Sequence, residues 1–328
     1  MPTISPRYDE GKEMFTLKIT VLGVGGMGSR FALMLHQAGN DVTLVDGWQA
    51  NVDAIRQNGI QANFNGKQVA AKMPIYTPAE VAQAGLQADL IVVFLKSNQL
   101  TATFSQVRAL IGKDTYVLCL LNGIGHEDVL EEFVAKDHLI LGITMWTAGM
   151  TGPGQVELLG DGEVELQNFE PAGKDFAQQV VDIFQGAGLN PHYSENVKYS
   201  IWRKACVNGT LNCLCALLDC NIGELGKTAE APALLHTIIA EFAAVAVKEG
   251  IKLDTEEVYQ HVAATFTADI ADHYPSMHQD LVQHHRRTEI GFINGAVARK
   301  GQKYGIATPY CTLLTQMVHV KEQLLGAK

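Results

Sequence analysis

Short apolar runs alternate with amphipathic helical stretches through the first half of the chain. The runs with the character of strands are Leu17–Gly23, Asp41–Asp46, Ala88–Lys96, Asp114–Gly123 and His138–Trp146, and Gly28–Gly39 has helical periodicity. This alternation predicts βαβ units around a parallel sheet. Between Thr151 and Phe169, short β segments alternate with Gly-Pro and Asp-Gly turns, which predicts β-hairpins.

The pattern changes near Glu195, where the β signals end and helical periodicity takes over. The helical stretches are Trp202–Cys220, Ala233–Gly250, Glu256–Asp272, Thr288–Gly305 and Pro309–Leu325. We therefore expect an α/β domain followed by an all-helical domain, with the boundary between Gly188 and Lys198.

Composition narrows the class of protein. The 328 residues include 25 basic and 35 acidic side chains, and the net charge of −10 argues against a general binder of nucleic acid. The six cysteines lie mostly inside apolar runs, unlike a disulfide framework. The N-terminus does not resemble a signal or transit peptide, and no stretch approaches 18 uninterrupted apolar residues. We expect a soluble, cytoplasmic protein that spans no membrane.

A glycine-rich loop follows the first predicted strand and opens the first predicted helix. Its sequence, from Gly23 to Gly28, fits G-x-G-x-x-G. In this context the glycines permit a tight turn, close approach to a pyrophosphate and packing of helix on strand, while the helix N-terminus faces the anion. The alternative is a plain glycine turn. The predicted cofactor contacts in this loop are Gly23, Gly25, Gly26, Met27 and Gly28.

Asp46 ends the second predicted strand, where a carboxylate can accept hydrogen bonds from the adenosine ribose of a dinucleotide. Gly47 and Trp48 follow it, and no Arg or Lys occurs until Arg56. A 2′-phosphate would meet a negative charge and no nearby cation, which favours NAD over NADP. The alternative is an aspartate that only caps the next helix.

Lys204, Asn208 and Asn212 are spaced at i, i+4 and i+8, so one cation and two amides share a helical face. These groups can hold the carboxylate, carbonyl and hydroxyls of a polar ligand, although a solvated face with a surface lysine fits the same spacing. Farther on, Ser276 and Asp280 are one turn apart, and Glu289 follows. They can complete the site, but we favour a structural role for Asp280, paired with one of the arginines that follow it.

The order of these motifs resembles the ketopantoate reductase family, also called 2-dehydropantoate 2-reductases, from Lys18 onward. Besides the glycine loop, the matching pieces are Lys96-Ser97, Leu121–Gly125, Trp202-Arg203-Lys204 with the two asparagines, Ser276–Asp280, and Thr288–Ile290 with Asn294-Gly295. The resemblance implies a Rossmann-type NAD-binding domain over residues 1–194, with residues 1–16 as an extension. Residues 195–328 are then the all-helical substrate and catalytic domain. It also implies a homodimer.

The resemblance further assigns roles to individual residues. Lys204 matches the general acid toward the substrate carbonyl, and Glu289 matches a carboxylate near the reaction centre. The other matches are substrate contacts at Asn208, Asn212 and Ser276 and positions beside the nicotinamide at Lys96 and Asn122. Hydride addition to a 2-keto acid builds negative charge on oxygen, which an ammonium group stabilises and protonates.

Two departures from the family pattern affect the expected substrate and cofactor. Asp46-Gly47 stands where many members have an arginine for the NADP phosphate, and His273-Tyr274-Pro275 replaces the usual Asn-containing run before the serine. The chain is at least as similar to the NAD-dependent D-2-hydroxyacid dehydrogenases of the family. We expect NAD(H)-dependent reduction of a branched or aromatic 2-keto acid to the D-2-hydroxy acid, with NADPH-dependent 2-dehydropantoate 2-reduction as the alternative.

Two other interpretations of the sequence are less favoured. Cys206, Cys213 and Cys220 recur every seven residues, which spans too much helix rise for a shared metal, so we expect packing residues and no metal site. A non-catalytic dinucleotide-binding sensor would share the first domain. Such a sensor would have no need for Lys204 and two asparagines on one face.

Overall fold

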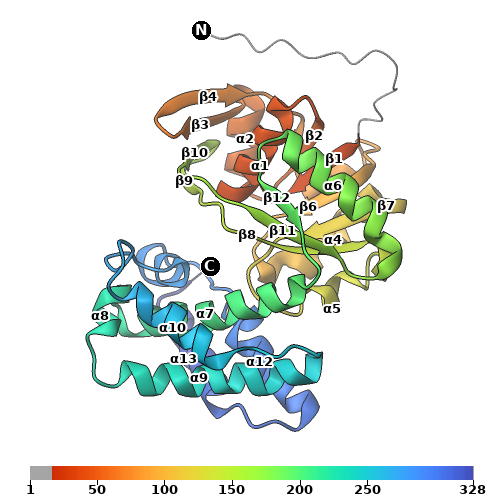
Figure 1. Ribbon diagram of the computed structural model, residues 1–328. Helices are drawn as coiled ribbons and strands as arrows, with labels where there is room; N and C mark the ends of the chain where they lie inside the picture. The colour runs from red at the N-terminus through yellow and green to blue at the C-terminus, as the bar shows by residue number, and fades with distance from the viewer. Residues whose placement is uncertain (1–16, 328) are drawn as a thin grey trace.

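The computed structural model describes residues 17–327 (Figure 1), and the predicted extension, residues 1–16, lies outside them. Two β-sheets and their covering helices form one half of the molecule, and helices form the other. Helix α7 runs along the junction and packs against strand β8 of the main sheet. The site described below lies on both sides of this junction.

The main sheet has eight strands within residues 17–327, in the order β12-β11-β8-β7-β6-β1-β2-β5. The run from β5 to β8 is parallel throughout, and its order is the 3-2-1-4-5-6 order of a dinucleotide-binding fold. Its strands are β1 (Lys18–Leu22), β2 (Asp41–Val45), β5 (Ile75–Tyr76), β6 (Ala88–Val93), β7 (Ile111–Cys119), β8 (Leu139–Thr144), β11 (Val164–Asn168) and β12 (Pro191–Tyr193).

A smaller sheet joins two segments that are far apart in the sequence. Its order is β4-β3-β10-β9, and β3 pairs with β10 in parallel. Arg30 of α1, fully buried, ties this sheet to the main one by donating to the carbonyls of Thr147 and Leu159. The strands are β3 (Ile60–Phe64), β4 (Lys67–Ala71), β9 (Gly149–Gly152) and β10 (Gln155–Leu158).

The helices of the first half connect the parallel strands and cover the sheet. In α1 (Gly26–Gln37) a continuous run of residues, Gly28–Leu35, is buried, because the helix lies between the two sheets. The other helices of this half are α2 (Gln49–Asn58), α3 (Pro78–Val81), α4 (Leu100–Gln106), α5 (His126–Leu130) and α6 (Lys174–Gly186).

Long helices pack around α7 in the second half and enclose a separate apolar core. Helix α9, extended by one 3-10 turn to Glu249, is long and apolar enough to cross a bilayer by length and hydropathy alone. It is packed here against α7, α10, α12 and α13. The helices are α7 (Val197–Leu218), α8 (Ile222–Gly226), α9 (Ala231–Ala246), α10 (Thr255–Thr265), α11 (Ser276–His278), α12 (Asn294–Tyr304) and α13 (Pro309–Leu324).

The predicted α/β and all-helical fold classes are confirmed, with three local differences. Strands β3, β4, β5 and β12 were not predicted, because their residues are mostly polar or half-buried. Of the predicted hairpins, β9 and β10 form one, whereas β11 pairs with β8 in the main sheet. Helix α10 ends at Thr265, and the expected continuation to Asp272 is a series of turns.

Candidate active site

The glycine loop connects β1 to the N-terminus of α1, and its crowding differs sharply between positions. A Cβ at Gly28 would lie 1.9 Å from the carbonyl oxygen of Gly23, and one at Gly26 would lie 2.8 Å from that of Ala148. A Cβ at Gly25 would meet no atom of the protein within 4 Å. The fold thus excludes side chains from two positions and leaves open space at the third. The first turn of α1 contains no acidic side chain that would repel an anion from its N–H groups.

Asp46, at the carboxyl end of β2, is buried beside this loop. One carboxylate oxygen accepts the N–H of Val24 at 2.6 Å, and the other accepts that of Trp48 at 2.7 Å. Asp46 therefore braces both the glycine loop and the start of α2, and its contact with a ribose stays a prediction. Burial raises the pKa of its carboxyl group, and these hydrogen bonds act in the opposite direction. Each oxygen keeps further acceptor capacity for ribose hydroxyls.

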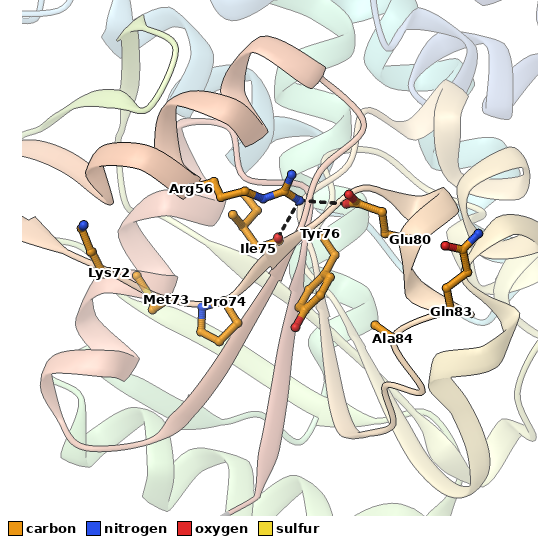
Figure 2. A pocket seen from close by; sticks show the side chains of 9 residues that line it. All are labelled: Arg56, Lys72, Met73, Pro74, Ile75, Tyr76, Glu80, Gln83 and Ala84. Carbon is orange, nitrogen blue, oxygen red and sulfur yellow. Dashed lines mark hydrogen bonds and ion pairs between the residues drawn. The ribbon is translucent and has the colours of Figure 1, made fainter.

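Arg56 is the first cation after Asp46, and it is already engaged. Its guanidinium donates to Glu80 at 2.9 Å and to the carbonyl of Ile75 at 3.1 Å, across a hollow of about 750 Å³ beside edge strand β5 (Figure 2). The Glu80 pKa is lowered by hydrogen bonds from Thr77 and Arg56. No predicted site residue lines this hollow. A 2′-phosphate near Asp46 would have to compete with Glu80 for this arginine.

Lys204 lies in the second turn of α7 and reaches across the junction. Its Nζ donates to the carbonyl of Thr144 at 2.8 Å, at the carboxyl end of β8. Burial lowers the pKa of Lys204 to about 8, against the attraction of Glu289. An amine with this pKa exchanges its proton near neutral pH, which suits a general acid. The helical domain thus places its lysine at the edge of the sheet where parallel folds bind ligands.

The two asparagines continue the same face of α7 away from the sheet. Asn212 is buried, and its Nδ2 donates to Oγ of Ser276 at 3.3 Å, while Asn208 is half-buried between Asn212 and Lys204. Ser276 is exposed and opens α11. The structure therefore brings the predicted substrate contacts together along one helix and the segment packed against it.

Glu289, just before a 3-10 turn at Ile290–Phe292, reaches the first domain. Its Oε1 accepts hydrogen bonds from Oγ of Ser97 at 2.8 Å and from the Ser97 N–H at 3.2 Å. Nε2 of His126 lies 2.9 Å from the same hydroxyl. Burial lowers the pKa of His126 to about 3, so this ring is neutral. Glu289 and Lys204 are electrostatically coupled, and both lie near the ends of sheet strands.

Lys96 and Asp280 form a further link between the domains. Nζ of Lys96 lies 2.6 Å from one oxygen of Asp280, and Arg286 lies 2.9 Å from the other. The expected pairing of Asp280 with an arginine is present, but the sequence did not indicate its partner Lys96. Lys96 nevertheless stays at the carboxyl end of β6, the edge of the sheet at which the resemblance puts the nicotinamide. Asn122, half-buried after β7, lies at the same edge.

Sequence reasoning missed two residues of the site, and it gave no role to a third. Ser97 belonged to a matching motif without a role, and neither His126 nor the carbonyl of Thr144 was singled out. One signal was available for His126, because it follows the Leu-Asn-Gly-Ile-Gly run after a buried strand. Ligand-binding residues of parallel sheets lie at such positions.

The arrangement supports a specific chemistry. A glycine loop with open space beside Gly25 and a buried aspartate suit a dinucleotide. A lysine, two amides, a serine and a carboxylate line the junction beside the loop. The lysine can stabilise negative charge on a carbonyl oxygen and donate a proton to it. This is the set of groups that reduction of a carbonyl needs, provided that a cofactor delivers the hydride.

Comparisons with known proteins place the chain in context. The family model described as ketopantoate reductase PanE/ApbA matches residues 19–171, and the model of its C-terminal domain matches residues 196–322. A 2-dehydropantoate 2-reductase of Lactococcus lactis is 51% identical over 95% of this chain and its own full length. One of Streptococcus pyogenes is 47% identical over 94% of this chain and 99% of its own length.

A solved structure with a different activity is at least as similar. The ternary structure of D-mandelate dehydrogenase with NADH and anilino(oxo)acetate is 54% identical to this chain. It covers 95% of this chain and 100% of its own, with a TM-score of 0.91. The chain is thus similar over nearly its whole length to enzymes named 2-dehydropantoate 2-reductase and to an enzyme named D-mandelate dehydrogenase.

Proposed function

The chain belongs to the ketopantoate reductase family, and we propose that it reduces a 2-keto acid to the D-2-hydroxy acid with NADH. The observation that supports this most directly is the place of Lys204. Its amine reaches from the helical half to the carboxyl end of β8, with a pKa lowered to about 8. A non-catalytic sensor of the dinucleotide would not require an amine tuned in this way.

In the proposed reaction, the residues of this chain bind the keto acid and move one proton. The nicotinamide supplies the hydride when it is bound. Lys204 hydrogen-bonds to the carbonyl oxygen, stabilises the charge that develops there and gives up its proton to it. Asn208, Asn212 and Ser276 hold the carboxylate and neighbouring polar groups. Glu289 sustains the protonated form of the lysine by its charge.

We propose that NAD(H) is the preferred cofactor. Asp46 offers its carboxylate to the ribose, and Arg56 is engaged by Glu80, so a 2′-phosphate would meet repulsion without a free cation. The contacts proposed for the cofactor are the glycine loop (Gly23, Gly25, Gly26, Met27, Gly28), Asp46, Lys96 and Asn122. The similarity to a D-mandelate dehydrogenase solved with NADH supports the same preference.

We propose a branched or aromatic tail for the substrate. The molecule bound with NADH in the similar D-mandelate dehydrogenase structure, anilino(oxo)acetate, is by its name a 2-oxo carboxylate with an aromatic substituent. Met145, which directly follows Thr144, is half-exposed and offers apolar surface near the lysine. The curated relatives named 2-dehydropantoate 2-reductase support ketopantoate with NADPH as the second candidate.

At the level of the whole chain, we propose a cytoplasmic homodimer. Residues 1–194 hold the cofactor and residues 195–328 supply the substrate contacts. An exposed apolar stripe on α13 favours association of two copies. The packing of α9 inside the helical core favours a protein that does not cross a membrane.

The deciding experiment measures kcat/KM for ketopantoate, 2-ketoisocaproate and phenylglyoxylate, each with NADH and with NADPH. We expect the largest value for one of the latter two acids with NADH. A dominant value for ketopantoate with NADPH would instead support the second candidate. A protein that binds NADH but reduces none of the three acids would contradict catalysis of this class.

A further inference from the structure

A chain of three side chains connects the two halves of the molecule beside Lys204. Glu289 comes from the helical half, and it is held by Ser97, which follows β6. Ser97 is in turn held by His126, the first residue of α5. Ser97 and His126 are both buried, and the His126 ring stacks on Phe292 with centroids 4.7 Å apart. The chain is therefore rigid and closed to solvent at the histidine end.

The direction of each hydrogen bond in this chain follows from the donors available. Ser97 has a single hydroxyl proton, which it donates to Glu289. The bond between Ser97 and His126 must then be donated by the ring, so His126 carries its proton on Nε2. A neutral ring with one N–H agrees with this assignment, because burial disfavours the charged form of the imidazole. The carboxylate of Glu289 is the final acceptor, and it also accepts the backbone N–H of Ser97.

Glu289 is close enough to attract Lys204, yet the ion pairs within residues 17–327 do not include these two. Lys204 donates instead to the carbonyl of Thr144. A carboxylate released from Ser97 would be free to turn toward the ammonium group. A tight pair would raise the lysine pKa and occupy a donor that the substrate needs.

We propose that Ser97 and His126 are positioning residues that hold the carboxylate of Glu289 apart from Lys204, so that the ammonium group remains available to the substrate carbonyl. The inference rests on the proposed function of Lys204 as proton donor. It assigns to Ser97 and His126 a part in the reaction, although neither is proposed to touch the substrate. His126 acts by orienting Ser97, and Ser97 acts by orienting Glu289.

Other titratable groups near Glu289 do not replace it as the acid that acts on Lys204. They are Lys96, which is paired with Asp280, the Cys119 thiol at the end of β7, and Glu127 beside His126. Burial raises the pKa of Cys119 to about 12, so the thiol is neutral over the working range. Burial also raises the pKa of Glu127, although the backbone and Lys300 oppose this. Glu289 is thus the acid whose orientation bears on Lys204.

The test compares Ser97→Ala with the unaltered protein by two measurements. The first is the pH profile of kcat/KM for keto-acid reduction, and the second is the 13C chemical-shift titration of the Lys204 side chain in the cofactor-free protein. We expect the alkaline limb and the titration midpoint to move upward together by about half a pH unit or more. We also expect kcat at pH 7 to fall while KM for NADH is unchanged.

Matched variants separate this role from plain stabilisation. His126→Gln keeps an N–H donor near Nε2 and should leave the limb in place, whereas His126→Leu should move it in the direction of Ser97→Ala. Thr210→Val removes a buried hydroxyl of α7 that bonds only to its own helix, and should move neither readout.

Two results would overturn the proposal. One is a folded Ser97→Ala protein whose Lys204 midpoint equals that of the unaltered protein. The other is an equal shift in His126→Gln and His126→Leu, which would remove His126 from the chain of positioning residues. Absence of turnover in the unaltered protein would contradict the proposed function instead. The chemical-shift titration would still show whether Ser97 and His126 hold Glu289 apart from Lys204.

Discussion

At the scale of single residues, the proposed chemistry depends on one amine, that of Lys204, held between a helix and a sheet. Desolvation lowers the pKa of Lys204 because the charged form loses water, while Glu289 limits the decrease. The resulting pKa of about 8 lets Lys204 carry a proton and also release it. The lysine is still mostly protonated at neutral pH, and it is a stronger acid than an exposed lysine.

This balance predicts opposite pH dependences for the two directions of the reaction. Reduction needs the ammonium form, so its kcat/KM should fall as pH rises through about 8; oxidation needs the free amine and should rise over the same range. Lys204→Ala should remove both limbs and lower kcat by about 10²–10⁴-fold, with NADH affinity retained. Lys204→Arg should rescue little, because a guanidinium does not release its proton.

The measurement is kcat and KM across pH for each variant, with the NADH dissociation constant as the control for folding. A loss below tenfold in Lys204→Ala would assign the proton donor elsewhere, with Glu289 acting through water as the next candidate. Retention of the limb in that variant would lead to the same conclusion.

The sequence predicted the site where neighbouring residues share a helix, and failed where the contacts are long-range. Lys204, Asn208 and Asn212 could be placed on one face because helical spacing is local and fixed. Ser97 and Glu289 are 192 positions apart, and no periodicity predicts their hydrogen bond. The same holds for the pair of Lys96 and Asp280, 184 positions apart.

At the scale of elements, the turn from β1 to α1 shows how one motif separates fold from binding. Gly28 is needed because the helix passes against the carbonyl of Gly23, which is a requirement of the protein alone. Gly25 has a negative φ and open space at its Cβ position, so nothing in the folded chain demands a glycine there. Only a ligand that enters this space would demand it.

The two glycines should therefore respond differently to the same substitution. Gly25→Ala should keep the melting temperature and raise the Kd for NADH at least about tenfold, equivalent to 1.4 kcal/mol. Gly28→Ala should lower the free energy of unfolding by about 1–3 kcal/mol or more through overpacking. Thermal unfolding and NADH fluorescence titration measure the two effects. Full NADH affinity in a folded Gly25→Ala protein would show that the pyrophosphate lies elsewhere.

Strong elements were predictable, whereas weak strands depended on their partners. Strands β1, β2, β6 and β8 and the second half of β7, from Thr115 to Cys119, are largely buried and mostly apolar in sequence. Strand β4 contains no buried residue, lies at the edge of the smaller sheet and pairs with β3. Strand β3 in turn pairs with β10, about 90 residues later, and this pairing has no local signal.

At the scale of the whole molecule, the site forms only where the halves meet. The cofactor loop and Asp46 belong to the sheets, while the lysine and the asparagines belong to α7. Two of the links across the junction, from Glu289 to Ser97 and from Lys96 to Asp280, end at residues that follow β6, and a third joins Lys204 to the carbonyl of Thr144 at the end of β8. In the proposed reaction, movement between the halves would therefore change the distance between the nicotinamide and Lys204.

The outer face of α13 presents an apolar stripe to solvent, far along the chain from these residues. Its members repeat at intervals of three and four residues, the spacing of a seam between paired helices. They are Tyr310, Leu313, Met317, Val320 and Leu324, each at least 42% exposed. The adjacent face of the helix, about 100° around from the stripe, packs into the helical core through Cys311, Leu314 and Val318. The exposed stripe has no partner within residues 17–327, and in the proposed homodimer it would pack against a second copy of the chain.

We therefore expect the unaltered protein to elute with twice the mass of one chain in light-scattering chromatography. The double variant Leu313→Glu, Met317→Glu should elute as a monomer, because burying two carboxylates in the interface would cost them their hydration. It should still bind NADH, since α13 holds no proposed cofactor contact. Val247→Glu, at a residue 61% exposed outside the stripe, is the matched control and should remain a dimer. A monomeric unaltered protein, or a dimer that survives both glutamates, would show that the two copies do not associate through α13.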